Sequence, residues 1–165
     1  MTHNSVGKET EQMVARWLRD EGGFPEARRI VRTGYDRPGG HTAADEGDID
    51  TGAPVTVQCK SLRPVDRMER AVPGWLAETE AQRQTAGTDV GLLVVRRWGT
   101  TDVGRWWAFL RLRDLSCVSE ERYRPSAPWG APVRLEVRHA TALLHTWGYG
   151  CPDIPTSATQ KGETA

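Results

Sequence analysis

DIDTGAPVTVQCK, residues 48–60, predicts a two-stranded hairpin at the centre of the fold. A Gly-Ala-Pro turn at 52–54 separates a short acidic strand from a β-branched strand that ends in a lysine. Because side chains alternate between the two faces of a strand, Thr56, Gln58 and Lys60 share one face and the other face is apolar. Asp48 lies across the turn from them. The hairpin therefore gathers a carboxylate, an amide and an ammonium group at one edge of an apolar sheet.

This grouping suits a divalent metal ion and a phosphate. Carboxylate oxygens bind Mg²⁺, and a lysine orients a water molecule or stabilises charge that develops on phosphorus. The chain has nineteen arginines but three lysines, so a lysine within an apolar strand indicates a need for its compact charge. The simpler alternative, a solvated lysine at the edge of a sheet, remains open at this point.

The rest of the chain predicts a single domain over residues 1–150 and a disordered tail over 151–165. A first helix is capped by Asn4 or Ser5 and stopped by Gly22-Gly23, with Glu11 at the edge of its apolar stripe. The other expected elements are strands at 29–33, 89–97, 105–112 and 133–137, a helix at 75–86 that Pro73-Gly74 opens, and a short helix at 140–147.

Composition excludes several classes of protein. No apolar stretch is long enough to span a bilayer, and the N-terminus lacks the pattern of a signal peptide, so we expect a cytoplasmic protein without a membrane partner. Three cysteines without a CxxC pair argue against a disulfide framework. A zinc site from His139, His145 and Cys151 is disfavoured because the spacings match no familiar zinc pattern. The formal net charge of zero shows no overall attraction to nucleic acid.

The order of these motifs resembles the PD-(D/E)XK nuclease superfamily, and within it the archaeal-type Holliday junction resolvases and their phage relatives. The resemblance covers roughly residues 5–112. It rests on Gly7-x-x-x-Glu11, Gly23-Phe24, the arginine-bearing segment 28–32, Gly47-Asp48-Ile49 and Gln58-Cys59-Lys60-Ser61. It implies an α/β fold that is restriction-endonuclease-like: a mixed central sheet flanked by helices, with an α-β-β-β-α-β core and a C-terminal strand and helix extension.

The resemblance also implies a catalytic site. Asp48 would be the central metal ligand and Lys60 the catalytic lysine. Glu11 would be an additional acidic ligand, and the backbone carbonyl of Cys59 would complete the site around Mg²⁺, which Mn²⁺ could replace. Gln58 would be a further metal ligand through its amide oxygen. It stands where the family has a glutamate, so the site has one negative charge fewer.

Asp50 and Glu46 are the two candidates to restore that charge. Arg28, Arg29, Arg32 and Ser61 are the expected contacts with DNA phosphates. The implied function is a Mg²⁺-dependent DNA endonuclease, namely a homodimeric Holliday junction resolvase in recombination or repair that acts on branched DNA. Two alternatives remain: a restriction or repair endonuclease for duplex DNA, and a catalytically weakened DNA-binding module of the same fold.

Overall fold

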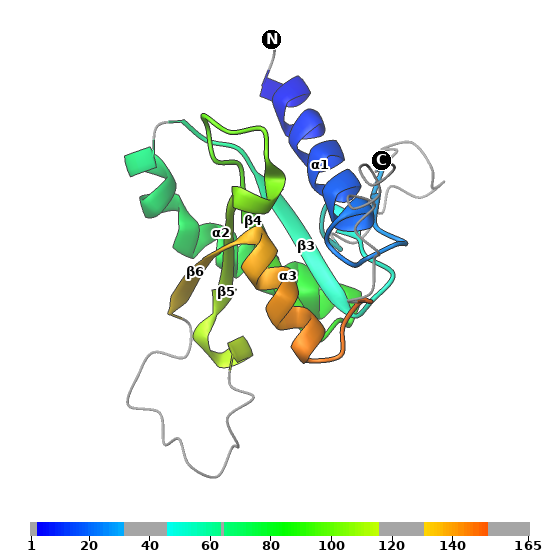
Figure 1. Ribbon diagram of the computed structural model, residues 1–165. Coiled ribbons are helices and arrows are strands. Elements are labelled where there is room, and N and C mark those ends of the chain that lie inside the picture. The colour runs from blue at the N-terminus through cyan, green and yellow to red at the C-terminus, as the bar shows by residue number, and fades with distance from the viewer. Residues whose placement is uncertain (1–2, 32–45, 64, 116–130, 152–165) are drawn as a thin grey trace, which may run out of the picture.

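A six-stranded mixed sheet forms the centre of the protein, and its strands lie in the order in which they follow along the chain (Figure 1). The computed structural model describes residues 3–31, 46–63, 65–115 and 131–151. The strands are β1 (Arg28–Arg29), β2 (Ile49–Asp50), β3 (Val55–Lys60), β4 (Val90–Val95), β5 (Trp107–Arg111) and β6 (Pro132–Glu136). Strands β3 and β4 pair in parallel, whereas the other neighbours are antiparallel.

Helices cover both faces of this sheet. They are α1 (His3–Asp20), α2 (Val65–Ala86) and α3 (Val137–Thr146), with short 3₁₀ turns η1 (Val103–Arg105) and η2 (Leu112–Leu115). Helix α2 lies on one face, and α1 and α3 lie on the other (Figure 1). Because parallel strands need a crossover connection, α2 provides the link between β3 and β4.

The apolar side chains divide between the two faces as a sheet with alternating side chains requires. Val57, Leu92 and Val94 pack with α1 and α3 in the larger core. Leu93 and Val95 pack with the apolar side of α2 in the smaller core. Every residue of β4 is buried, since both of its faces are covered.

The predicted order of helix, three strands, helix and strand is confirmed, and so is the mixed α/β class. The predicted start of the second helix was wrong. Helix α2 begins at Val65, and Pro73 lies inside it. Proline removes one helical hydrogen bond, but Met68, Val72 and Leu76 lie on both sides of Pro73 and pack together on the sheet. This packing holds the helix across the proline.

Other boundaries differ by a few residues. The first strand was expected at 29–33, and β1 consists of Arg28–Arg29, with residues 32 and 33 outside the described part. The short C-terminal helix begins at Val137, earlier than the predicted 140. The expected tail at 151–165 lies, apart from its first residue, outside the described residues. None of the described helices has the length and apolar character of a membrane span.

Candidate functional site

The hairpin brings Asp48 against the carboxyl end of β3. Ile49 pairs with Val57, and the Asp48 amide donates to the carbonyl of Val57 (2.9 Å), so Asp48 comes beside Gln58. Gly47 permits this approach: its φ is +104°, and a Cβ atom there would lie 2.9 Å from the Thr56 side chain. The Asp48 carboxylate accepts a hydrogen bond from the backbone N–H of Cys59 (2.7 Å). The carboxylate thus takes the place of a strand partner for the Cys59 N–H, just beyond the end of β2.

The backbone and the thiol of Cys59 lie in different surroundings. Its N–H and C=O point to the same side of the strand, so the carbonyl also faces the edge at which Asp48 lies. Its side chain is buried in the larger core. Burial raises the pKa of the Cys59 thiol, Asp48 and Glu11 raise it further, and Lys60 lowers it. Three of the predicted site residues therefore act electrostatically on one buried atom.

Gln58 is held on the other face of β3 by α2. Its side chain is 3% exposed. The Thr79 hydroxyl donates to the Gln58 amide oxygen (2.7 Å), and the Gln58 amide nitrogen donates to the carboxylate of Glu78 (3.3 Å). A buried amide normally satisfies both of its polar ends, and Gln58 does.

Glu78 also binds Lys60. The Lys60 ammonium lies 2.8 Å from the same Glu78 oxygen that Gln58 contacts. The side chain of Lys60 is 28% exposed and that of Glu78 is 55% exposed. Glu78 was not predicted from the sequence. It belongs to the exposed side of α2, so apolar periodicity does not mark it. The one usable signal was Gln58 itself, because the resemblance implies a glutamate there and so a carboxylate from another element.

Asp50 and Glu46, the candidates to restore the negative charge that Gln58 lacks, lie elsewhere. Asp50 forms an ion pair with Arg28 (2.7 Å) and accepts a hydrogen bond from the Gly52 amide. Glu46 is exposed and lines an open cleft with Asp50, on the outer side of the hairpin. Neither residue makes a hydrogen bond or an ion pair with Gln58 or Lys60 among the described residues.

The remaining predicted residues are distributed as follows. Glu11 on α1 forms an ion pair with Arg29 on β1. The hydroxyl of Ser61 is buried without a hydrogen-bond partner in the described part of the chain. Arg32 lies outside the described residues. The expected DNA contacts Arg28 and Arg29 are thus engaged with acidic side chains.

The donors at this edge are hard oxygen atoms, the type that Mg²⁺ prefers. They are the carboxylates of Asp48 and Glu78, the carbonyl of Cys59 and the amide oxygen of Gln58, which in this structure accepts a hydrogen bond from Thr79. Within the described ranges, no three histidine, cysteine or acidic side chains come together as a metal-binding group. The residues therefore fit a site with few protein carboxylates, in which water completes the coordination of the ion. The disfavoured zinc site of His139, His145 and Cys151 is likewise not a metal-binding group among the described residues. The ring nitrogens of His145 face the backbone carbonyls of Gly22 and Tyr149 instead.

Comparison with known proteins adds no relative. The chain matches no protein-family model, and neither a curated protein nor a solved structure is significantly similar to it. The resemblance to PD-(D/E)XK nucleases therefore stays a prediction that rests on the motifs and the geometry of this site.

Proposed function

We propose that the protein is a Mg²⁺-dependent DNA endonuclease with a restriction-endonuclease-like fold. The observation that carries this proposal is the contact of one carboxylate, Glu78, with both Lys60 and Gln58, at the strand end where Asp48 also lies. An acid and an ammonium group at such an edge can bind a metal ion and a phosphate together. The predicted order of elements around them supports the same assignment.

Each residue has a defined part in this proposal. Asp48 and Glu78 would hold the metal ion, together with the oxygen atoms of Gln58 and Cys59. When bound there, the ion would supply Lewis-acid chemistry: it would polarise the scissile phosphate and lower the pKa of a bound water molecule. Lys60, released from Glu78 by the incoming charge, would stabilise the negative charge that builds up on the phosphoryl oxygens. Glu11 would hold Arg29 in position rather than bind the ion directly.

The substrate class follows from the resemblance. A resolvase would cut a four-way junction symmetrically as a two-fold dimer, whereas a restriction or repair enzyme would cut linear duplex DNA. The alternative without catalysis has its own support. The Gln58 amide oxygen already accepts a hydrogen bond from Thr79, and Lys60 is already paired. A protein that binds DNA but does not cut it would keep these contacts.

A cleavage assay on two substrates tests the proposal. A labelled four-way junction and a linear duplex of the same arm sequence are incubated with the protein in Mg²⁺, in Mn²⁺ and in EDTA. We expect symmetric nicks in the junction with either metal ion and none in EDTA. Cutting of both substrates would identify a general endonuclease, and binding without cutting would identify the non-catalytic module. Sedimentation of the same samples measures whether the protein is a dimer.

Two variants show whether the activity belongs to this site. Lys60→Ala should lower the cleavage rate by about 100-fold or more, the scale expected for one electrostatic group in a transition state. Glu78→Gln keeps the size of the side chain and should raise the Mg²⁺ concentration needed for half-maximal rate. Lys8→Ala is the matched control, since Lys8 is an exposed lysine on α1. Equal rates for all variants would assign the activity to a contaminant.

A further inference from the structure

The carboxyl ends of the two parallel strands carry positive charge next to the candidate site. Lys60 pairs with Val95, and the Arg96 amide donates to the Lys60 carbonyl (2.9 Å), so Arg96 follows directly beside the site. Arg63 follows Lys60 by three residues, and α2 begins at Val65 with Arg67 and Arg70 in its first two turns. We refer to Arg63, Arg67, Arg70 and Arg96 as the arginine surface.

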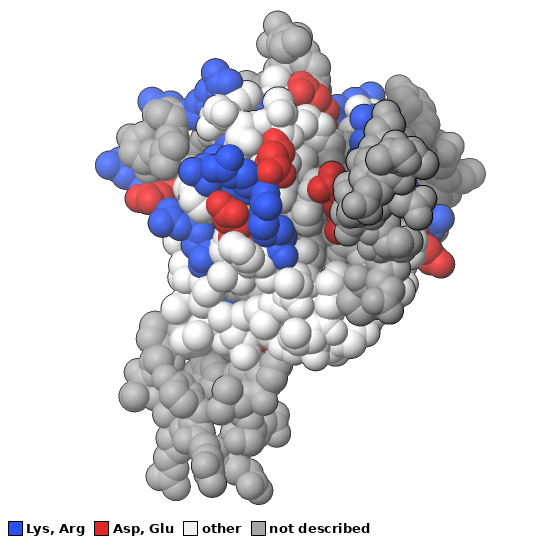
Figure 2. Space-filling model, viewed as in Figure 1, with Lys and Arg blue, Asp and Glu red and all other residues white. Residues whose placement is uncertain are grey.

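Most of this surface is free of acidic partners. Arg63, Arg67 and Arg70 are exposed, and none of them forms an ion pair with a side chain that the structure describes. The Arg96 side chain is 14% exposed and pairs with Glu9 at 3.2 Å, so it contributes to the surface mainly through its contact with Trp98. Figure 2 shows lysine and arginine side chains, with several acidic side chains among them, on the upper part of this face, whereas much of the lower described surface is uncharged. An excess of positive charge on one region is the electrostatic footprint of an anionic partner.

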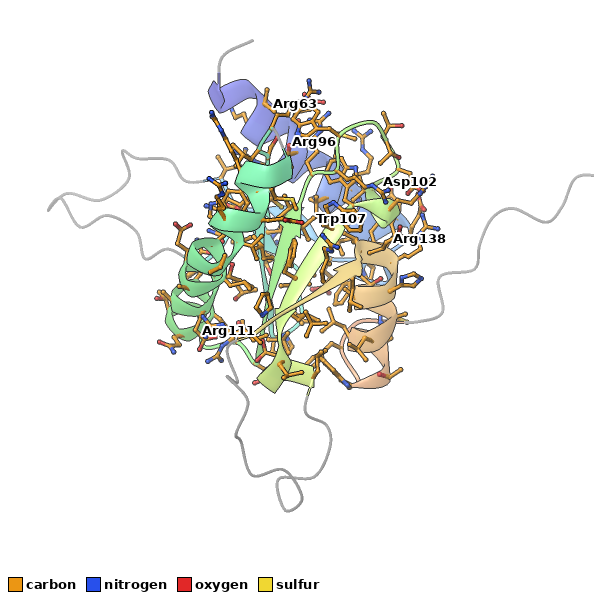
Figure 3. The ribbon with its side chains drawn as sticks, turned by 90° about the vertical axis from the view of Figure 1, so that its left-hand side faces the viewer. Arg63, Arg96, Asp102, Trp107, Arg111 and Arg138 are labelled. Atoms are coloured by element: carbon orange, nitrogen blue, oxygen red, sulfur yellow. The ribbon has the colours of Figure 1, made fainter. Side chains whose placement is uncertain are left out.

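Tryptophan holds two of these arginines in place. The guanidinium groups of Arg63 and Arg96 lie 3.4 and 4.5 Å from the ring centre of Trp98. The Trp98 ring is fixed in turn, because its N–H donates to the carbonyl of Leu62 (3.0 Å). In Figure 3, Arg63 and Arg96 lie together at the upper end of the molecule, above Trp107. A guanidinium stacked on an aromatic ring loses little freedom on binding and keeps its N–H edges for a planar or tetrahedral oxyanion.

We propose that the arginine surface binds the phosphate backbone of a nucleic acid and leads it to Lys60. This inference rests on the proposed function for the position of the scissile phosphate. Three residues of chain span at most about 10 Å, and one strand carries a phosphate for about every 3.4 Å of helix axis, so nearby phosphates of one strand lie within this reach. Phosphates bound at Arg63 and at Lys60 can therefore belong to one strand. The indole faces of Trp98 carry arginines, so the surface contacts phosphates rather than stacks on bases.

Binding without cleavage tests this surface. The affinity of a fluorescent 20-base-pair duplex and of a four-way junction is measured in EDTA at several salt concentrations, for the wild type and for R63A/R67A. Each lost phosphate contact should lower the slope of log affinity against log salt by about 0.9. The double variant should bind roughly 50-fold more weakly at 0.1 M salt. R16A/R19A removes the same charge from exposed positions on α1 and should change the affinity by less than about threefold.

The outcomes separate this inference from the proposed function. If R63A/R67A binds as R16A/R19A does while the wild type cleaves, the arginine surface is wrong and the endonuclease stands. If binding depends on Arg63 and Arg67 but no DNA is cut in Mg²⁺, the surface stands and the endonuclease is wrong. Two further results would overturn the inference. If the wild type binds no DNA, the surface does not bind nucleic acid. If polyglutamate binds as tightly as the duplex does, the surface suits an acidic protein instead.

Discussion

At the scale of single residues, Asp48 combines a structural contact with a chemical one. One carboxylate oxygen accepts the Cys59 N–H at 2.7 Å, so the side chain is held by the strand that carries the other site residues. A carboxylate that is fixed in this way is preorganised for a cation. The structural contact needs an oxygen acceptor, whereas the proposed chemical contact needs its negative charge.

Asp48→Asn separates the two contacts. The asparagine oxygen can still accept the Cys59 N–H, so the variant should fold, but metal-dependent cleavage should fall by about 100-fold or more because the charge is lost. Asp50→Asn is the matched control two residues away in the same hairpin, where the carboxylate pairs with exposed Arg28. It should cleave within a few-fold of the wild type. Similar rates for the two variants would remove Asp48 from the site.

The Cys59 thiol predicts how stability changes at alkaline pH. Burial, Asp48 and Glu11 raise the pKa of this thiol above its unfolded value of about 8.5. The folded state therefore keeps a proton that the unfolded state loses, and the free energy of unfolding should fall as pH rises above about 8.5. The maximum slope from this group is about 1.4 kcal/mol per pH unit.

The difference between wild type and Cys59→Ala isolates this effect. The variant lacks the thiol, so its free energy of unfolding, measured with urea between pH 8 and pH 10, should fall less steeply than that of the wild type. Parallel curves would mean that the thiol titrates in the folded protein as it does in the unfolded chain.

At the scale of elements, local patterns gave reliable predictions: an apolar stripe for the first helix, alternation for the hairpin and a continuous apolar run for β4. The first helix, the hairpin and a strand near 89–97 were expected from the sequence. Helix α1 begins at His3, so the expected caps Asn4 and Ser5 lie inside it, and β4 is limited to Val90–Val95. Pro73 misled the prediction for α2, because a local rule about proline could not show that three apolar side chains pack on the sheet around it. Glu78 was missed for a related reason: its contacts with Gln58 and Lys60 exist only once α2 lies on β3.

Two glycine variants test the local structure of α2 and of the hairpin. Gly74 lies inside α2, and a Cβ atom there would meet nothing within 4 Å. Gly74→Ala should raise the free energy of unfolding by about 1 kcal/mol, the cost of glycine within a helix. Gly47→Ala should lower it by about 1–3 kcal/mol, because alanine is strained at a φ of +104° and its Cβ would press on Thr56. Thermal or urea unfolding measures the stability of both variants. Because the two changes are expected to have opposite signs, each variant serves as the control for the other.

At the scale of the whole molecule, the C-terminal part closes onto the first helix and its turn. The two ring nitrogens of His145 lie 2.8 Å from the Tyr149 carbonyl and 3.0 Å from the Gly22 carbonyl. The same ring stacks on Phe24, and the Cys151 amide donates to the carbonyl of Gly23. This contact between α3 and the end of α1 joins residues more than 120 positions apart, so no local pattern in the sequence could indicate it.

His145→Ala should therefore destabilise the whole protein. It removes a hydrogen bond and a ring contact and leaves backbone carbonyls without their partner, at an expected cost of about 2–3 kcal/mol in the free energy of unfolding. His139→Ala is the matched control, since His139 is exposed on the same helix. It should change stability by less than about 0.5 kcal/mol. Equal effects would show that the His145 contacts contribute little.

The strand order in the sheet bears on how the protein folds. Each strand pairs with its neighbour in the sequence, and short connections close quickly, but the parallel pair β3 and β4 must wait until the segment 61–89 has folded back across the sheet. We expect amide protection in pulse-labelled hydrogen exchange to appear between β4 and β5 before it appears between β3 and β4. Lys60 ends β3 and Glu78 lies within the segment that folds back, so the proposed catalytic pair would form together with this slow closure.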